Sequence, residues 1–76
     1  MIRVTVYLGI GSWKVTKTVT LIACPHVDDV IDVDGVGVTC EQVCIFSDRV
    51  QVEQLERFQS PTDMDEYTAM GWKRTP

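Results

Sequence analysis

The chain has no run of about 18 apolar residues, so the sequence predicts no membrane-spanning helix and no membrane partner. It contains a single histidine, His26, and no recognisable catalytic signature. We therefore expect a protein that is not an enzyme, with no catalytic residues and no cofactor. The first residues alternate apolar and polar side chains and do not resemble a signal peptide, which favours a cytoplasmic location.

Cysteine is scarce, and Cys24, Cys40 and Cys44 do not form the even set of a secreted disulfide scaffold. We expect free thiols in a reducing compartment. Together with His26, these cysteines supply the four side chains of a tetrahedral zinc site. In one continuous strand, however, Cys40 and Cys44 would lie ~13 Å apart at ~3.3 Å per residue, too far to share a metal ion. Core thiols without a metal are the prediction, and a zinc-stabilised module is the alternative.

Alanine, the strongest helix former, occurs only twice, whereas valine, isoleucine and threonine make up 25 of the 76 residues. This composition favours strands over helices. A chain of this length is too short for two hydrophobic cores, so we expect one small domain spanning residues 1–76.

Apolar and polar residues alternate over residues 2–10 and again over residues 13–21, with Gly11-Ser12 between them. A two-residue connection that begins with glycine favours a type II′ turn, so the pattern predicts an antiparallel hairpin. One face of this hairpin should lie in the core, and its members are Val4, Val6, Leu8, Val15 and Val19.

Asp34-Gly35 predicts a second hairpin, because this pair of residues favours a tight type I′ turn. Its strands are expected over residues 30–33 and 36–46, and a short fifth strand over residues 50–52.

The remaining sequence changes to a helical period. Apolar residues recur every three positions over residues 52–58, which predicts a short helix there. A second helix is expected to begin after Ser60-Pro61 and to end at Gly71. We therefore predict an α+β fold, in which a four- to five-stranded antiparallel β-meander precedes one or two short C-terminal helices.

Charge is divided unevenly along the chain. Residues 1–23 carry three cations and no acid, a net +3, whereas residues 24–76 carry four cations and eleven acids, a net −7. Such asymmetry favours docking onto a charged partner or onto a second copy of the chain. The acids cluster in and just after the second hairpin, and the predicted partner-binding residues there are Asp28, Asp29, Asp32, Asp34 and Glu41. Trp72, beyond the predicted helix, is expected to be an exposed anchor for the same purpose.

Three further groups of residues suggest other chemistry. Single-stranded nucleic-acid-binding modules combine positive charge with aromatic rings, and the predicted first hairpin carries both, in Arg3, Lys14, Lys17, Tyr7 and Trp13. Three cations are few for such a site, however, and the net charge of the chain is negative. A calcium loop through Asp32, Asp34 and Glu41 lacks its first ligand. Cys24 with His26 has no third group to orient a nucleophile and its base.

The predicted class is therefore a non-enzymatic protein-binding module, and the alternative is a small zinc-stabilised or single-stranded nucleic-acid-binding module. Size and acidity suggest a small inhibitor of host machinery, of the kind that phages and mobile elements direct at nucleases or CRISPR effector complexes. Its partner would be a basic or nucleic-acid-binding protein, and an unpaired sheet edge also favours a homodimer. Direct binding to nucleic acid is not expected.

Overall fold

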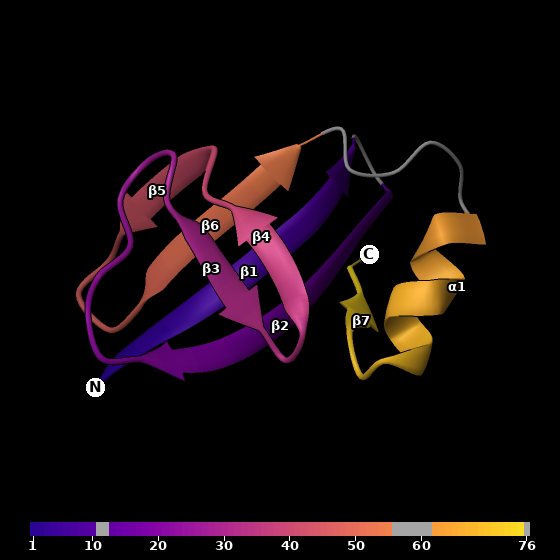
Figure 1. Ribbon diagram of the computed structural model, residues 1–76, viewed down its shortest axis with the longest axis horizontal. Coiled ribbons are helices and arrows are strands. Elements are labelled where there is room, and N and C mark those ends of the chain that lie inside the picture. The colour runs from indigo at the N-terminus through magenta and orange to yellow at the C-terminus, as the bar shows by residue number, and fades with distance from the viewer. Residues whose placement is uncertain (11–12, 56–61, 76) are drawn as a thin grey trace.

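The computed structural model describes residues 1–10, 13–55 and 62–75. These residues form, in chain order, β1 (Ile2–Ile10), β2 (Trp13–Leu21), β3 (Val30–Val33), β4 (Val36–Thr39), β5 (Gln42–Ile45), β6 (Val50–Leu55), α1 (Thr62–Ala69) and β7 (Lys73–Arg74) (Figure 1). They contain no helix long and apolar enough to cross a membrane.

Two sheets form the two layers of the structure. The larger has the strand order β5-β6-β1-β2-β7, and the smaller consists of β3 and β4, which cross in front of the larger sheet (Figure 1). The predicted α+β meander is wrong, because the described residues are mostly strand and α1 has only eight residues. The larger sheet is also mixed, since β6 returns to lie parallel to β1.

The first hairpin is confirmed in its predicted register. β1 and β2 pair antiparallel from Ile2 opposite Leu21 to Ile10 opposite Trp13. The turn at residues 11–12 lies outside the described residues. Four of the five predicted core residues are fully buried, and the fifth, Val19, is partly buried and packs against them.

The second hairpin is also confirmed at Asp34-Gly35, where both residues have positive φ angles of 50° and 92°, as a type I′ turn requires. Its predicted second strand over residues 36–46 is wrong. β4 ends at Thr39, and β5 then joins the larger sheet beside β6. Glu41 N–H bonds to the carbonyl of Glu53 at this crossing, so the backbone exchanges one pairing partner for another.

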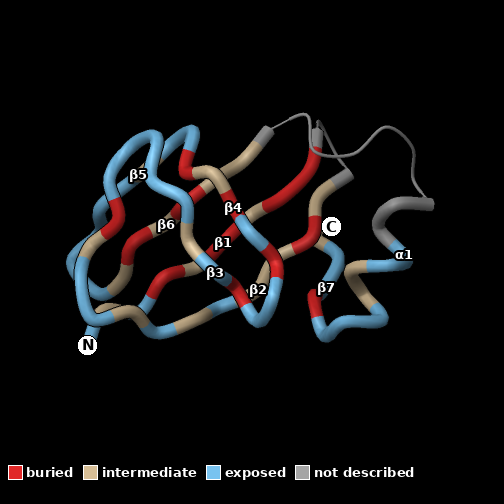
Figure 2. The backbone as a smooth tube through the Cα atoms, in the orientation of Figure 1, coloured by how far each residue is buried: buried red, intermediate tan, exposed pale blue. Residues whose placement is uncertain are grey.

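Residues of both layers form one core, and Figure 2 shows buried segments on the strands of both sheets. Valine side chains of β1, β2 and β6 meet valines of β3 and β4, and Trp72 closes the side next to α1. The buried apolar residues are Val4, Val6, Leu8, Val15, Val33, Val36, Val38, Cys40, Val50, Val52 and Trp72.

The helix predicted over residues 52–58 is wrong where the structure describes it, because Val52 to Leu55 belong to β6. Residues 56–61, including Ser60-Pro61, lie outside the described part of the chain. The predicted end of the second helix is confirmed. Gly71 has φ 98°, its N–H donates to Thr68 O, and Trp72 N–H donates to Tyr67 O, which is the Schellman pattern of a helix C-terminus.

Candidate protein-binding surface

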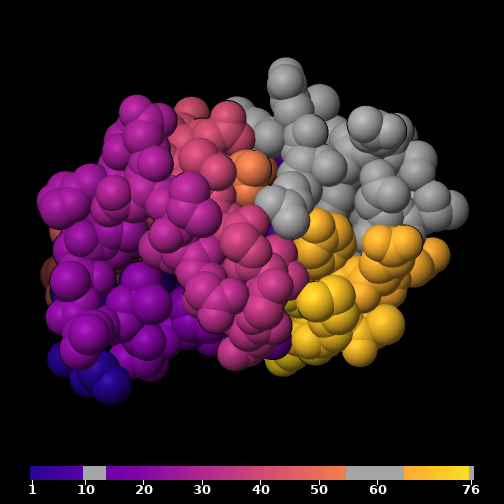
Figure 3. Space-filling model, viewed as in Figure 1, coloured from indigo at the N-terminus to yellow at the C-terminus, as the bar shows by residue number. Residues whose placement is uncertain are grey.

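The outer face of the β3–β4 hairpin turns away from the core. Strand alternation directs Ile31 and Val33 inward, and therefore directs Val30 and Asp32 outward. We call this outer face, together with the loop that precedes it, the hairpin surface; its residues are Val27, Asp28, Asp29, Val30, Asp32 and Glu41, all exposed. Figure 3 shows the hairpin and the preceding loop as the front of the molecule.

The loop before β3 is held by backbone hydrogen bonds to the end of β4. Asp28 N–H donates to the carbonyl of Cys40 (2.9 Å), and Cys40 N–H donates to the carbonyl of Asp29 (2.8 Å). Asp28 has a φ of 74°, a left-handed conformation that aspartate tolerates better than most residues. These bonds hold the backbone of Asp28 and Asp29 beside Cys40, the residue that precedes Glu41, at the open end of the hairpin.

Two of the aspartates also support the local backbone. A carboxylate oxygen of Asp29 accepts the N–H of His26 (2.8 Å), and one of Asp32 accepts the N–H of Gly35 (3.1 Å). Each carboxylate therefore orders a turn with one oxygen and leaves its charge exposed to solvent.

Asp34 differs from the other predicted acids. Its carboxylate lies 2.7 Å from the ammonium of Lys17, which reaches it from the core-facing side of β2. Its charge is compensated within the chain. Among the described residues, no lysine or arginine forms an ion pair with Asp28, Asp29 or Asp32, and the nearest basic group is His26, whose Nδ1 lies 3.6 Å from a carboxylate oxygen of Asp29.

Apolar side chains lie among these acids. Val30 is 70% exposed and Val27 is also mostly exposed. Gly37 pairs with Asp32 in the hairpin. A Cβ at Gly37 would lie 3.9 Å from Val30 Cγ1, so the absence of a side chain at Gly37 leaves one side of Val30 uncovered. An apolar centre inside a charged rim is the usual anatomy of a protein interface. Sequence reasoning missed the two valines, because only the strand pairing shows which valines of this run face outward.

Trp72 is not part of any exposed site. The predicted exposed anchor is wrong, because the side chain is only 3% exposed. The Schellman turn at Gly71 folds the chain back, so that Trp72 contacts Tyr67 edge to face, with ring centroids 5.9 Å apart. It contributes to the core instead.

The four candidate metal ligands are dispersed. Cys40 is buried, Cys24 is half-buried, and Cys44 and His26 are exposed on β5 and on the loop before β3. Among the described residues, no three His, Cys, Asp or Glu side chains are close enough together to hold a metal ion. Burial, and to a lesser degree the charge of Asp29, raises the pKa of the Cys40 thiol above its ordinary value. That thiol is therefore a poor nucleophile and a poor metal ligand at neutral pH.

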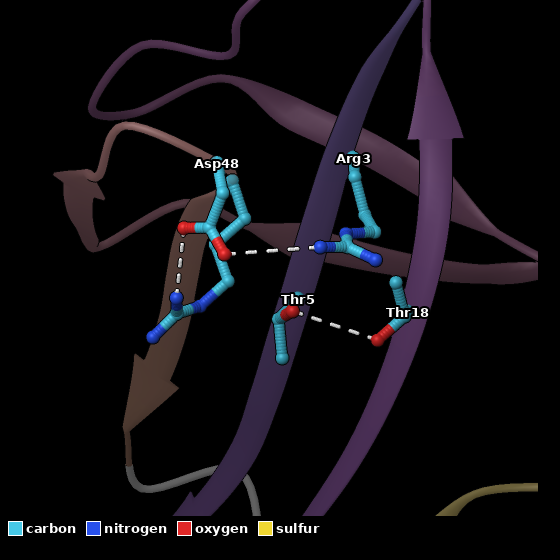
Figure 4. A network of polar contacts seen from close by, with 5 residues as sticks. Arg3, Thr5, Thr18 and Asp48 are labelled. Carbon is cyan, nitrogen blue, oxygen red and sulfur yellow. Dashed lines mark hydrogen bonds and ion pairs between the residues drawn. The ribbon is translucent and has the colours of Figure 1, made fainter.

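The basic residues of the first hairpin do not form a single patch. Lys17 lies on the core-facing side of the sheet, opposite Val6, whereas Arg3 and Lys14 lie on the other side, as the register requires. Each cation also has an acid nearby: Lys14 lies 2.5 Å from Glu53, and Arg3 lies 3.8 Å from Asp48 (Figure 4). The arrangement does not favour binding to nucleic acid, which needs uncompensated positive charge.

No protein-family model matches the chain, and comparison with curated proteins and with solved structures found no match.

Proposed function

We propose that the protein is a non-enzymatic protein-binding module that recognises a basic protein through the hairpin surface. The observation that carries the proposal is the combination of exposed Val27 and Val30 with three aspartates that have no lysine or arginine partner among the described residues. Apolar contacts would supply affinity, and the acids would select a positively charged partner and speed its association.

Within this class, the role we propose is that of a small inhibitor. A nucleic-acid-binding protein presents a basic channel to the phosphate backbone, and an acidic surface of similar charge density can occupy such a channel. A nuclease or a CRISPR effector complex is the kind of target that this chemistry fits. The proposal also includes a reducing, cytoplasmic setting, which three free thiols support.

The test removes charge without removing the hydrogen bonds that order the loop. Asn replaces Asp at positions 28, 29 and 32, because an asparagine side chain still accepts a hydrogen bond and tolerates the left-handed conformation of residue 28. The matched control neutralises Asp48, Asp65 and Glu66, which changes the net charge by the same amount elsewhere on the chain. Each protein is tagged and used to capture partners from host lysate, and the captured proteins are identified by mass spectrometry.

We expect wild type and control to capture the same basic protein, and the hairpin variant to lose it. Association measured with that partner should slow steeply as salt is raised for wild type and only weakly for the hairpin variant. Equal capture by all three proteins would show that the hairpin surface is not the binding site.

A further inference from the structure

β5 forms the edge of the larger sheet on the side away from α1 (Figure 1). At the turn that follows β5, Phe46 N–H donates to Arg49 O, so Phe46 directs its backbone groups toward the strand β6. By alternation, Cys44 directs its backbone groups toward β6, whereas Val43 and Ile45 direct theirs outward. No described strand pairs with this outer edge. The N–H and C=O groups of two residues are therefore available to another strand.

The two edges of the sheet differ in how they are protected. On the opposite edge, β7 pairs with part of β2, and Lys17 is a charged residue that points inward from that strand. Inward-pointing lysines and short covering strands are the usual devices that prevent sheets from joining. β5 has the sequence Gln-Val-Cys-Ile, without charge or proline, and Ile45 is 73% exposed. β5 is itself short, but within the described residues no strand covers it and no lysine points inward from it.

A second copy of the chain fits this edge in one register. Two antiparallel strands related by a two-fold axis normal to the sheet pair each residue with one of the same parity. Centring the axis on Cys44 places Val43 opposite Ile45 of the other copy, twice, and Glu41 opposite Ser47. Centring it on Val43 would instead place the charge of Glu41 opposite Ile45. The first register joins apolar to apolar side chains and puts no like charges opposite each other.

We propose that the protein forms a two-fold symmetric homodimer through the outer edges of β5, with Cys44 on the symmetry axis. The outward groups of Val43 and Ile45 then form the hydrogen-bonded pairs across the dimer, and both exposed Ile45 side chains become covered. This interface goes beyond the proposed function, because the hairpin surface takes no part in the strand pairing. A dimer would display that surface twice.

The register makes a geometric prediction about Cys44. Because the hydrogen-bonded pairs are formed by Val43 and Ile45, the two Cys44 residues form a non-hydrogen-bonded pair, with Cα atoms ~4.5 Å apart. A disulfide accommodates Cα separations of about 4.4 to 6.8 Å. Cys44 is exposed, so a thiol oxidant such as diamide can reach both thiols and couple them, the diamide being reduced as the disulfide forms.

The experiment measures mass and cross-linking on the same set of proteins. Under reducing conditions, sedimentation equilibrium should give about 17 kDa for wild type, twice the 8.6 kDa of one chain. Ile45→Lys places a lysine on the edge and should raise the dissociation constant at least about tenfold. Val30→Lys puts the same residue on the hairpin surface and should leave the dimer unchanged. Diamide should cross-link wild type and Cys24→Ser, but not Cys44→Ser.

Two results would overturn the dimer, and a third would overturn its register. One is a wild-type protein that stays at 8.6 kDa at millimolar concentration, and the other is a dimer that Ile45→Lys does not weaken. Cross-links that persist in Cys44→Ser would show that the register is wrong. The outcome is separate from that of the proposed function, because Val30→Lys should abolish partner capture and leave the dimer, whereas Ile45→Lys should do the reverse.

Discussion

Replacing Trp72 with alanine tests whether this side chain holds the C-terminal segment against the sheet. The side chain is almost fully buried and packs edge to face against Tyr67. Truncating a buried tryptophan to alanine costs about 3–5 kcal/mol. The core of a domain below 70–80 residues supplies about the same amount in total. We therefore expect Trp72→Ala to be largely unfolded at 25 °C.

Trp72→Phe separates the loss of packing from the loss of a polar group. The indole Nε1 of Trp72 is buried and has no hydrogen-bond partner among the residues that the structure describes. A buried donor without a partner costs about 1–3 kcal/mol, and phenylalanine removes that donor while it keeps an aromatic ring on Tyr67. We expect this variant to stay folded and to lose less than half of the stability that alanine loses.

The assay is urea unfolding at 25 °C followed by far-UV circular dichroism, since Trp13 complicates a fluorescence signal. Met70→Ala is the matched control, because Met70 lies two residues away and is half exposed. It should cost less than about 1 kcal/mol. If Trp72→Ala were as mild as this control, Trp72 would not belong to the core, and the burial on which the reasoning rests would be wrong.

Three other predictions probe single features. Lys17→Met should change the free energy of unfolding by less than about 1 kcal/mol, because the apolar side chain fills the same space and Asp34 stays well hydrated. Asp34→Ala should cost more, because it leaves the mostly buried Lys17 ammonium without its partner. The reverse order in urea unfolding would contradict this. Gly71→Ala should cost about 1–3 kcal/mol in the same assay, because an alanine is strained at φ 98°; an unchanged midpoint would argue against the Schellman turn. The contribution of Cys40 to the free energy of unfolding should be constant below pH 8 and should fall as pH rises past ~8.5, where the unfolded Cys40 thiol ionises while the folded thiol, whose pKa is raised, stays protonated. The slope should approach ~1.4 kcal/mol per pH unit, and Cys40→Val should lose that part of it.

Local pairing was predictable from sequence where the connection is short. In both hairpins the turn residues and the alternation of valines agree on one register, and a slip by one residue would expose the whole apolar face. The parallel pairing of β6 with β1 was not predictable in this way. Val4 pairs with Val50, which is far away in the sequence, and no local pattern indicates which distant strand will lie beside β1 in the sheet.

The candidate site was predictable in its acids and not in its centre. Exposed Asp28, Asp29 and Asp32 follow from the sequence, because aspartates rarely lie in a core without a partner. The helical period over residues 52–58 misled because Val52 belongs to the strand β6, where it is spaced two residues from the other buried valine, Val50. Trp72 misled for a different reason: a residue just beyond a Schellman turn is directed back toward the helix.

The uneven charge along the chain has an intramolecular use that sequence alone does not show. Each cation of the first hairpin meets an acid from the later sequence, and the pairs are Arg3 with Asp48, Lys14 with Glu53, and Lys17 with Asp34. These pairs consume the positive charge of residues 1–23 and leave the acids of the hairpin surface in excess. Salt therefore screens the fold and the proposed partner contact together. A loss of partner binding at high salt is evidence for the acidic surface only where unfolding measured at the same salt shows the protein still folded.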